Sequence, residues 1–271
     1  MIRDITIGQY YPANSVIHKL DPRVKLFATI IYIVALFAFK GIAGLAVITA
    51  GLIAVIKLSK VPFKFMVKGL KAIIVLLMIT SLFNLFFTTG NVVFFKWGPF
   101  QISDTGIVNS VLMAIRLVYL ILGTSIMTLT TTPNQLTDGL EKSLSPLNKI
   151  HVPVHAIAMM MSIALRFIPI LIEETDKIMK AQMARGADFE SGNLIQKAKS
   201  MVPLLVPLFV SAFRRAEDLA MAMEARCYNG GEGRTKMKPL VYKKQDRVAY
   251  VFLFAFLAVV IVLAILVPFP Q

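Results

Sequence analysis

Long apolar runs alternate with short basic segments through the first half of the chain, and one more apolar run closes it. The runs cover residues 24–39, 42–56, 70–87, 106–129 and 248–267. About 20 apolar residues of helix cross the ~30 Å hydrocarbon core of a bilayer, and a helix satisfies its own backbone polar groups there. The pattern therefore predicts an all-α, polytopic membrane protein with about five transmembrane helices.

Between the fourth and fifth runs, charged residues return and the apolar positions take up a helical period. We expect three parts: a bundle of four transmembrane helices in residues 1–130, a cytosolic or interfacial region with two long amphipathic coupling helices in residues 131–247, and a last transmembrane helix in residues 248–271. One alternative stays open. Residues 152–172 are apolar enough for a further crossing, although His155, Arg166 and two prolines count against it.

The charge pattern orients these helices. The chain is 57% hydrophobic and carries a net charge of +14, and 26 of its 29 Lys and Arg residues lie in residues 1–25, 57–71 and 130–247. Because cytoplasmic loops collect Lys and Arg, the N-terminus is predicted inside and the C-terminus outside. Cations confined to one side of a membrane favour anionic lipid and acidic protein surfaces as partners, and not a nucleic acid.

Three local features add to this picture. Residues 91–99 are aromatic and bounded by turn residues, which predicts an external hairpin near the membrane interface. Arg116 lies inside the fourth apolar run, where an ion is costly and often functional, and its role stays open. Cys227 is the only cysteine, so no intramolecular disulfide or cysteine cluster can form.

Two amphipathic helices are predicted inside residues 131–247, and they resemble each other. The apolar positions of the first include Ile168, Leu171, Ile178 and Met179, and those of the second include Leu208, Phe209, Ala212, Ala216, Leu219 and Met223. A shift of 41 residues aligns Ala184 and Arg185 of the first with Ala225 and Arg226 of the second. The two helices thus form a short internal repeat.

Each helix ends in an arginine that continues its apolar stripe. Arg185 follows Ile178 by seven residues, Arg226 follows Leu219 by seven, and helix-breaking residues come directly afterwards. An arginine in a last helical turn can simply complement the helix dipole and cap carbonyls. Two matched arginines, each preceded by Ala, instead favour partner binding, because a guanidinium makes several directed hydrogen bonds in a groove.

These residues resemble a known family, the transmembrane or T component of energy-coupling factor transporters, which is related to the membrane subunit of cobalt importers. The resemblance covers nearly the whole chain and includes Ala184-Arg185-Gly186, Ala225-Arg226-Cys227 and the run from Met223 to Gly231. The family pattern is Ala-Arg-Gly at both places. Cys227 therefore departs from it and puts a role for glycine at that position in doubt.

The resemblance implies a non-catalytic scaffold in a prokaryotic cytoplasmic membrane. Residues 184–186 and 225–227 would each bind one of two ATP-binding-cassette ATPases, and a separate substrate-binding membrane subunit would reorient in the bilayer to import a vitamin or metal ion. The chain lacks a Gly-x-x-x-x-Gly-Lys-Ser/Thr phosphate loop. ATP and Mg²⁺ are accordingly expected in the partner ATPases, with no cofactor in this chain. The transported compound and the identity of the two ATPases stay open.

Three alternatives remain. A conventional ABC-importer permease is suggested by Glu224-Ala225 followed by Gly230, although no Ile-x-Leu-Pro ending follows. A membrane enzyme would have to use His151 and His155 with the nearby Asp138 and Glu141, which do not form a His-Glu-x-x-His motif. A secondary transporter would need ionisable groups near the midplane, where only Arg116 qualifies.

Overall fold

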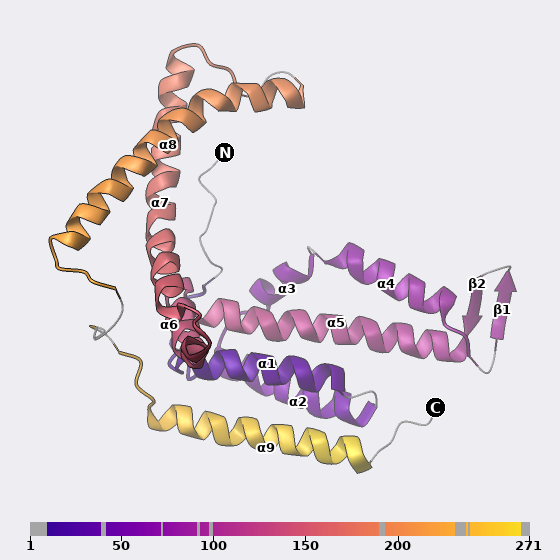
Figure 1. Ribbon diagram of the computed structural model, residues 1–271. Coiled ribbons are helices and arrows are strands. Elements are labelled where there is room, and N and C mark those ends of the chain that lie inside the picture. The colour runs from indigo at the N-terminus through magenta and orange to yellow at the C-terminus, as the bar shows by residue number, and fades with distance from the viewer. Residues whose placement is uncertain are drawn as a thin grey trace. The chain divides into compact units, whose positions relative to one another are not determined.

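The computed structural model describes residues 10–38, 42–71, 73–90, 93–97, 100–189, 193–230, 237 and 239–266 (Figure 1). The chain divides into two compact units. The bundle unit comprises Gly8–Gly139 and Leu240–Gln271, and the arm unit comprises Met1–Ile7 and Leu140–Pro239.

Four helices pack together in the bundle unit. They are α1 (Pro22–Ala38), α2 (Ile42–Ser59), α5 (Asp104–Thr130) and α9 (Lys244–Leu266). Helix α1 contacts the other three, and α2 also contacts α5 and α9. Figure 1 shows these helices side by side, with residues from the two ends of the chain meeting where α1 lies against α9. The fold of this unit therefore needs both the first and the last apolar run.

The basic segment of residues 57–71 folds largely as a helix. Helix α3 (Phe63–Lys71) buries Met66 completely and packs against α5, while Lys64 and Lys71 are exposed. Helix α4 (Ile74–Phe87) follows at an inclination of 64° and also packs along α5. The predicted third span of residues 70–87 therefore takes in only the end of α3 before α4, because the basic segment forms a helix of its own that continues to Lys71.

The predicted hairpin is present in the described residues. Strand β1 (Val93–Trp97) pairs antiparallel with β2 (Phe100–Ser103), while residues 91, 92, 98 and 99 lie outside the description. Ser103 then starts α5: its Oγ accepts the Gly106 N–H at 3.0 Å and donates to the Thr88 carbonyl at 2.8 Å. The external position of the hairpin stays a prediction.

The structure confirms the all-α, membrane-type fold, but it does not confirm the count of about five spans. Among the described residues, α5, α9 and α7 (Val154–Ala184) are long and apolar enough to cross a membrane, and the α3–α4 pair could form a fourth span. Helix α1 has 17 residues and α2 has 18. Because α7 meets the criterion by length and composition, the alternative of a crossing near residues 152–172 also stays open.

Most described residues of the arm unit are helical, with turns and short non-helical segments between the helices. The end of α6 (Pro133–Leu144) leads into the short 3-10 helix η1 (Ser145–Ile150), which is followed by α7 and by α8 (Leu194–Glu224). Helices α7 and α8 have 31 residues each. Pro169 lies inside α7, so the first predicted arm is the second half of a longer helix. These two helices carry the sites predicted from the sequence.

Candidate functional site: two matched helix tips

Helices α7 and α8 pack against each other where they cross (Figure 1). An ion pair joins them: Arg215 Nη2 donates to Glu174 Oε2 at 3.0 Å. These two residues are 41 positions apart, which is also the shift that aligns the repeat. The contact thus joins equivalent positions of the repeat at the crossing of the two helices.

The two tips lie at equal distances from this pair along their helices. Arg185 follows Glu174 by eleven residues, and Arg226 follows Arg215 by eleven. At about 1.5 Å of rise per residue, each tip is roughly 16 Å of helix beyond the pair. The two tips are therefore equivalent in their position relative to the ion pair at the crossing.

The first tip ends in a left-handed turn. The Gly186 N–H donates to the Met183 carbonyl at 3.0 Å, and the Ala187 N–H donates to the Gln182 carbonyl at 3.0 Å. Gly186 has φ +88°, a conformation that glycine adopts without strain. This combination of bonds is a Schellman motif, which satisfies carbonyls that would otherwise lack donors at a helix end.

The second tip repeats this arrangement bond for bond. The Cys227 N–H donates to the Glu224 carbonyl at 2.8 Å, and the Tyr228 N–H donates to the Met223 carbonyl at 3.0 Å. Each donor and acceptor is the residue 41 positions after its counterpart in the first tip. Cys227 has φ +54°, so it takes the left-handed position that Gly186 takes in the first tip. The Cys in place of Gly therefore changes the side chain and the strain, but not the turn.

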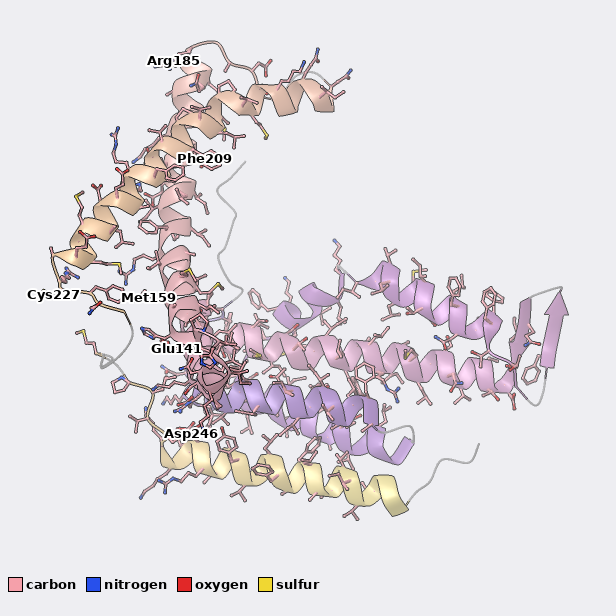
Figure 2. The ribbon with its side chains drawn as sticks, in the orientation of Figure 1. Glu141, Met159, Arg185, Phe209, Cys227 and Asp246 are labelled. Carbon is pink, nitrogen blue, oxygen red and sulfur yellow. The ribbon has the colours of Figure 1, made fainter. Side chains whose placement is uncertain are left out.

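The backbone hydrogen bonds at the tips leave the side chains of the two arginines available to bind a partner. Ala184, Arg185, Ala225 and Arg226 are all exposed, and neither guanidinium forms an ion pair with another residue in the part of the chain that the structure describes. Capping by the guanidinium is not needed, because backbone N–H groups already bond the last carbonyls. Figure 2 shows Arg185 and Cys227 at the ends of two different helices. This geometry favours partner binding over a purely local role.

An exposed apolar face on α8 extends beyond the predicted stripe. Met201, Val202, Leu205, Val206, Phe209, Val210 and Phe213 are each about half exposed or more. Phe209 lies near the crossing in Figure 2 and is 60% exposed. The spacing of Val202, Val206, Phe209 and Phe213 is helical and was visible in the sequence. What the sequence could not show is that the described residues of the unit leave this face exposed.

The residues considered for other functions are only partly brought together. In the arm unit, His155 Nδ1 lies 2.9 Å from Glu141 Oε1, while His151 is exposed. Within the described residues no group of three or more His, Cys, Asp or Glu side chains is placed to hold a metal ion. In the bundle unit, the Arg116 guanidinium lies 5.9 Å from the centre of the Phe37 ring, which is within reach of a cation–π interaction.

Comparison with known proteins covers both units. The cobalt transport protein family matches residues 13–237. A relative from Clostridium kluyveri is 58% identical over 250 residues, covering 92% of this chain and 93% of its own, and one from Bacillus subtilis is 50% identical over 246 residues, covering 91% and 93%. A relative from Thermosediminibacter oceani is 54% identical over 250 residues, covering 92% and 94%. All three are called energy-coupling factor transporter transmembrane protein EcfT.

Proposed function

The chain belongs to the cobalt transport protein family, and from that premise we propose that it is the membrane scaffold of an ATP-driven energy-coupling factor importer. Its relatives carry the name of the transmembrane component of such transporters. In the proposal, the scaffold links two partner ATPases to a substrate-binding membrane subunit in the cytoplasmic membrane. ATP hydrolysis in the partners then drives that subunit to reorient and release a vitamin or metal ion.

The observation that carries this proposal is the pair of equivalent tips. Arg185 and Arg226 have the same backbone hydrogen bonds around them and are equally far from the Glu174–Arg215 pair. Two equivalent tips suit two ATPase subunits of the same fold, each with a groove that receives one guanidinium. Ala184 and Ala225 leave room for close approach, and the carboxylates or carbonyls of a groove are the acceptors that a guanidinium binds best.

The crossed helices offer a route from the ATPases to the membrane. Each arm is one long helix, and the ion pair at the crossing couples them, so a displacement of either tip is passed to the other. The exposed apolar face of α8 suits a membrane-embedded partner, since it would otherwise face water. We assign the substrate-binding subunit to this face and expect ATP and Mg²⁺ to be bound only by the ATPases.

The test is a charge reversal at both tips, Arg185→Glu together with Arg226→Glu. Each change replaces a donor to the groove by a carboxylate. Since a hydrogen bond to a charged group contributes about 1.5–3 kcal/mol, each ATPase should bind at least ~10-fold more weakly. Co-purification of the ATPases through a tag on this chain measures the loss, and uptake of the transported compound should stop.

A matched control and the single variants sharpen this test. Lys177→Glu with Arg214→Glu places the same charge change on exposed residues of both arms away from the tips, and it should leave co-purification intact. Each single tip variant should retain one ATPase in place of two. Normal amounts of ATPase on the double tip variant would refute the proposal. Absence of a separate substrate-binding subunit from the intact complex would favour a conventional permease.

A further inference from the structure

A cavity of about 330 Å³ lies at one end of the bundle unit, where α1 and α9 begin and α2 ends. Three segments form its walls: residues 14–19 before α1, residues 57–60 at the end of α2, and Gln245 in the first turn of α9. The positive-inside pattern predicts that this end faces the cytoplasm. The cavity is thus expected at the level of the lipid headgroups.

The lining of the cavity is suited to an anion. Lys19, Lys57 and Lys60 line it, all three are exposed, and none forms an ion pair with another described residue. Asn14 and Gln245 add side-chain amides, and the lining residues that the structure describes include no Asp or Glu. Three ammonium groups around one space repel each other, and an anion bound among them offsets this repulsion. A phosphate group offers the charge and the several acceptor oxygens that these donors require.

Two of the walls are held in shape by polar contacts. His18 is hydrogen-bonded through Nδ1 to Ser15 Oγ at 2.7 Å and through Nε2 to the Tyr11 carbonyl at 2.9 Å, which fixes the segment that carries Lys19. The fully buried Ser59 donates to the Ile56 carbonyl at 2.7 Å. It thereby orders the turn in which Lys60 takes a left-handed φ of +54°. The cavity is therefore formed before any ligand binds.

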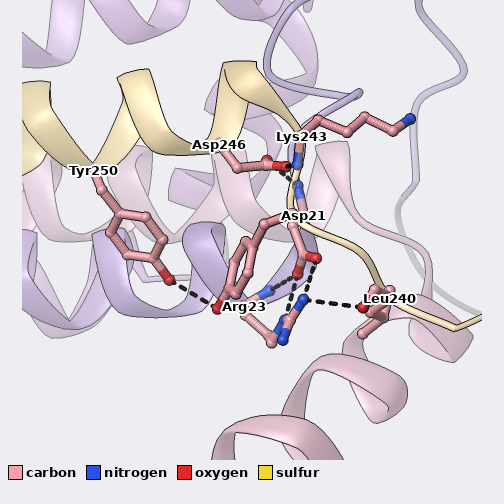
Figure 3. Close-up of polar contacts among 7 residues, drawn as sticks. Asp21, Arg23, Leu240, Lys243, Asp246 and Tyr250 are labelled. Carbon is pink, nitrogen blue, oxygen red and sulfur yellow. Dashed lines mark hydrogen bonds and ion pairs between the residues drawn. The ribbon is translucent and has the colours of Figure 1, made fainter.

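The third wall is tied to the first by a buried carboxylate (Figure 3). Asp246 accepts the Asp21 N–H at 2.8 Å and the Lys243 N–H at 2.7 Å, and it is 1% exposed. Asp21 in turn forms an ion pair with Arg23 at 2.8 Å. These contacts lock the entry of α1 to the entry of α9. Gln245, next to Asp246, is thereby held beside residues 14–19.

Apolar side chains lead from the cavity along the helices. Val16 and Leu58 line it and are 52% and 54% exposed. Val55, three residues before Leu58 on the same side of α2, is 40% exposed, and Phe252, seven residues after Gln245 on α9, is 71% exposed. A free phosphate needs no apolar neighbours, whereas a phospholipid needs a path for its acyl chains.

We propose that this cavity binds the phosphate of an anionic phospholipid headgroup, with the acyl chains lying over Val55 and Phe252. The three lysines supply the charge, and Asn14 and Gln245 supply further hydrogen bonds. Basic pockets between transmembrane helices on the cytoplasmic side are suited to such headgroups. The site is independent of the helix tips, so this inference does not rest on the proposed function.

The test compares phosphatidylglycerol with phosphatidylcholine by native mass spectrometry of the detergent-purified protein. The wild type should retain one phosphatidylglycerol per chain in preference to phosphatidylcholine. The triple variant Lys19→Gln, Lys57→Gln, Lys60→Gln should bind phosphatidylglycerol on the order of 100-fold more weakly, because each lysine near an anionic headgroup contributes roughly a factor of five. Replacement of the same three lysines by Arg should restore binding.

The controls distinguish lipid binding at this site from nonspecific attraction to positive charge and from binding of free phosphate. Lys64→Gln, Lys71→Gln, Lys142→Gln removes three other exposed lysines and should leave binding unchanged. Inorganic phosphate alone should compete only weakly. The proposal is overturned if the triple variant retains as much phosphatidylglycerol as this control. It is also overturned if inorganic phosphate binds through the three lysines while phosphatidylglycerol is not preferred over phosphatidylcholine.

Discussion

Replacing Gly186 with Ala should loosen the tip of α7 without creating any collision. Gly186 has φ +88°, and a methyl group added there would meet nothing within 4 Å. The cost is therefore that of the backbone alone, about 1–2 kcal/mol for an L-residue in the left-handed region. The two hydrogen bonds of this turn, from the Gly186 and Ala187 N–H groups, should open roughly 5–30 times more often.

The second tip gives the opposite test. Cys227 already bears this strain at φ +54°, so Cys227→Gly relieves it. Part of the gain is lost because glycine is more flexible in the opened state. A net stabilisation of about 0.5–1 kcal/mol should slow opening of the Tyr228 N–H roughly two- to fivefold. The two substitutions should thus change the two tips in opposite directions.

Amide hydrogen exchange of the purified protein, followed by mass spectrometry of peptides covering each tip, measures both effects. Gly230→Ala is the matched control, since Gly230 also has positive φ, +79°, and open space around it but donates neither tip bond. Exchange at Ala187 that stays unchanged in the Gly186→Ala variant would refute the left-handed turn at the first tip. Faster exchange at Tyr228 in Cys227→Gly would refute the strain assigned to the second.

Three further predictions concern the bundle unit. Asp246→Ala leaves two backbone N–H groups without their acceptor and should destabilise this unit by about 1–3 kcal/mol for each, read as a lower Tm in detergent. Burial by itself raises the pKa of Asp21, but hydrogen bonds and charge from Arg23 lower it below its ordinary 3.8. Because the folded pKa is lowered, ionised Asp21 stabilises the folded protein at pH values above its ordinary pKa, and this stabilisation is lost as the pH falls through the folded pKa. The Tm deficit of Asp21→Asn should therefore be constant from about pH 7 to 5 and shrink below about pH 4. Gly123→Ala would drive a methyl group into the Tyr32 ring and should lower the Tm, and an unchanged Tm would contradict this packing of α5 against α1.

The positions of the two helix tips could be predicted from the local sequence. The shift of 41 residues, the two Ala-Arg pairs and the helix breakers after them all follow from order along the chain, and the structure has the corresponding helix ends at these positions. The sequence left open whether Cys227 takes the same backbone conformation in the second tip that Gly186 takes in the first. A residue other than glycine enters the left-handed region only when its surroundings require it. The hydrogen bonds of the turn impose that conformation.

The membrane spans were predicted from the sequence only in part. The runs of residues 106–129 and 248–267 are read correctly as long helices over their described residues, because a continuous apolar run is a local signal. The division of residues 63–87 into two inclined helices was not predicted, since Met66 is buried in a cluster with Leu52 of α2 and with residues of α5, which is far away in sequence.

The sequence by itself determined that this protein is an all-α membrane protein with a repeated, arginine-tipped pair of amphipathic helices. These properties depend on periodicity and motif spacing, which are local. Only the tertiary structure decided that Glu174 meets Arg215 where the helices cross, and that three segments distant in sequence enclose one basic cavity. Such contacts depend on long-range packing, in which each pairing is selected by the burial of side chains contributed by the rest of the fold.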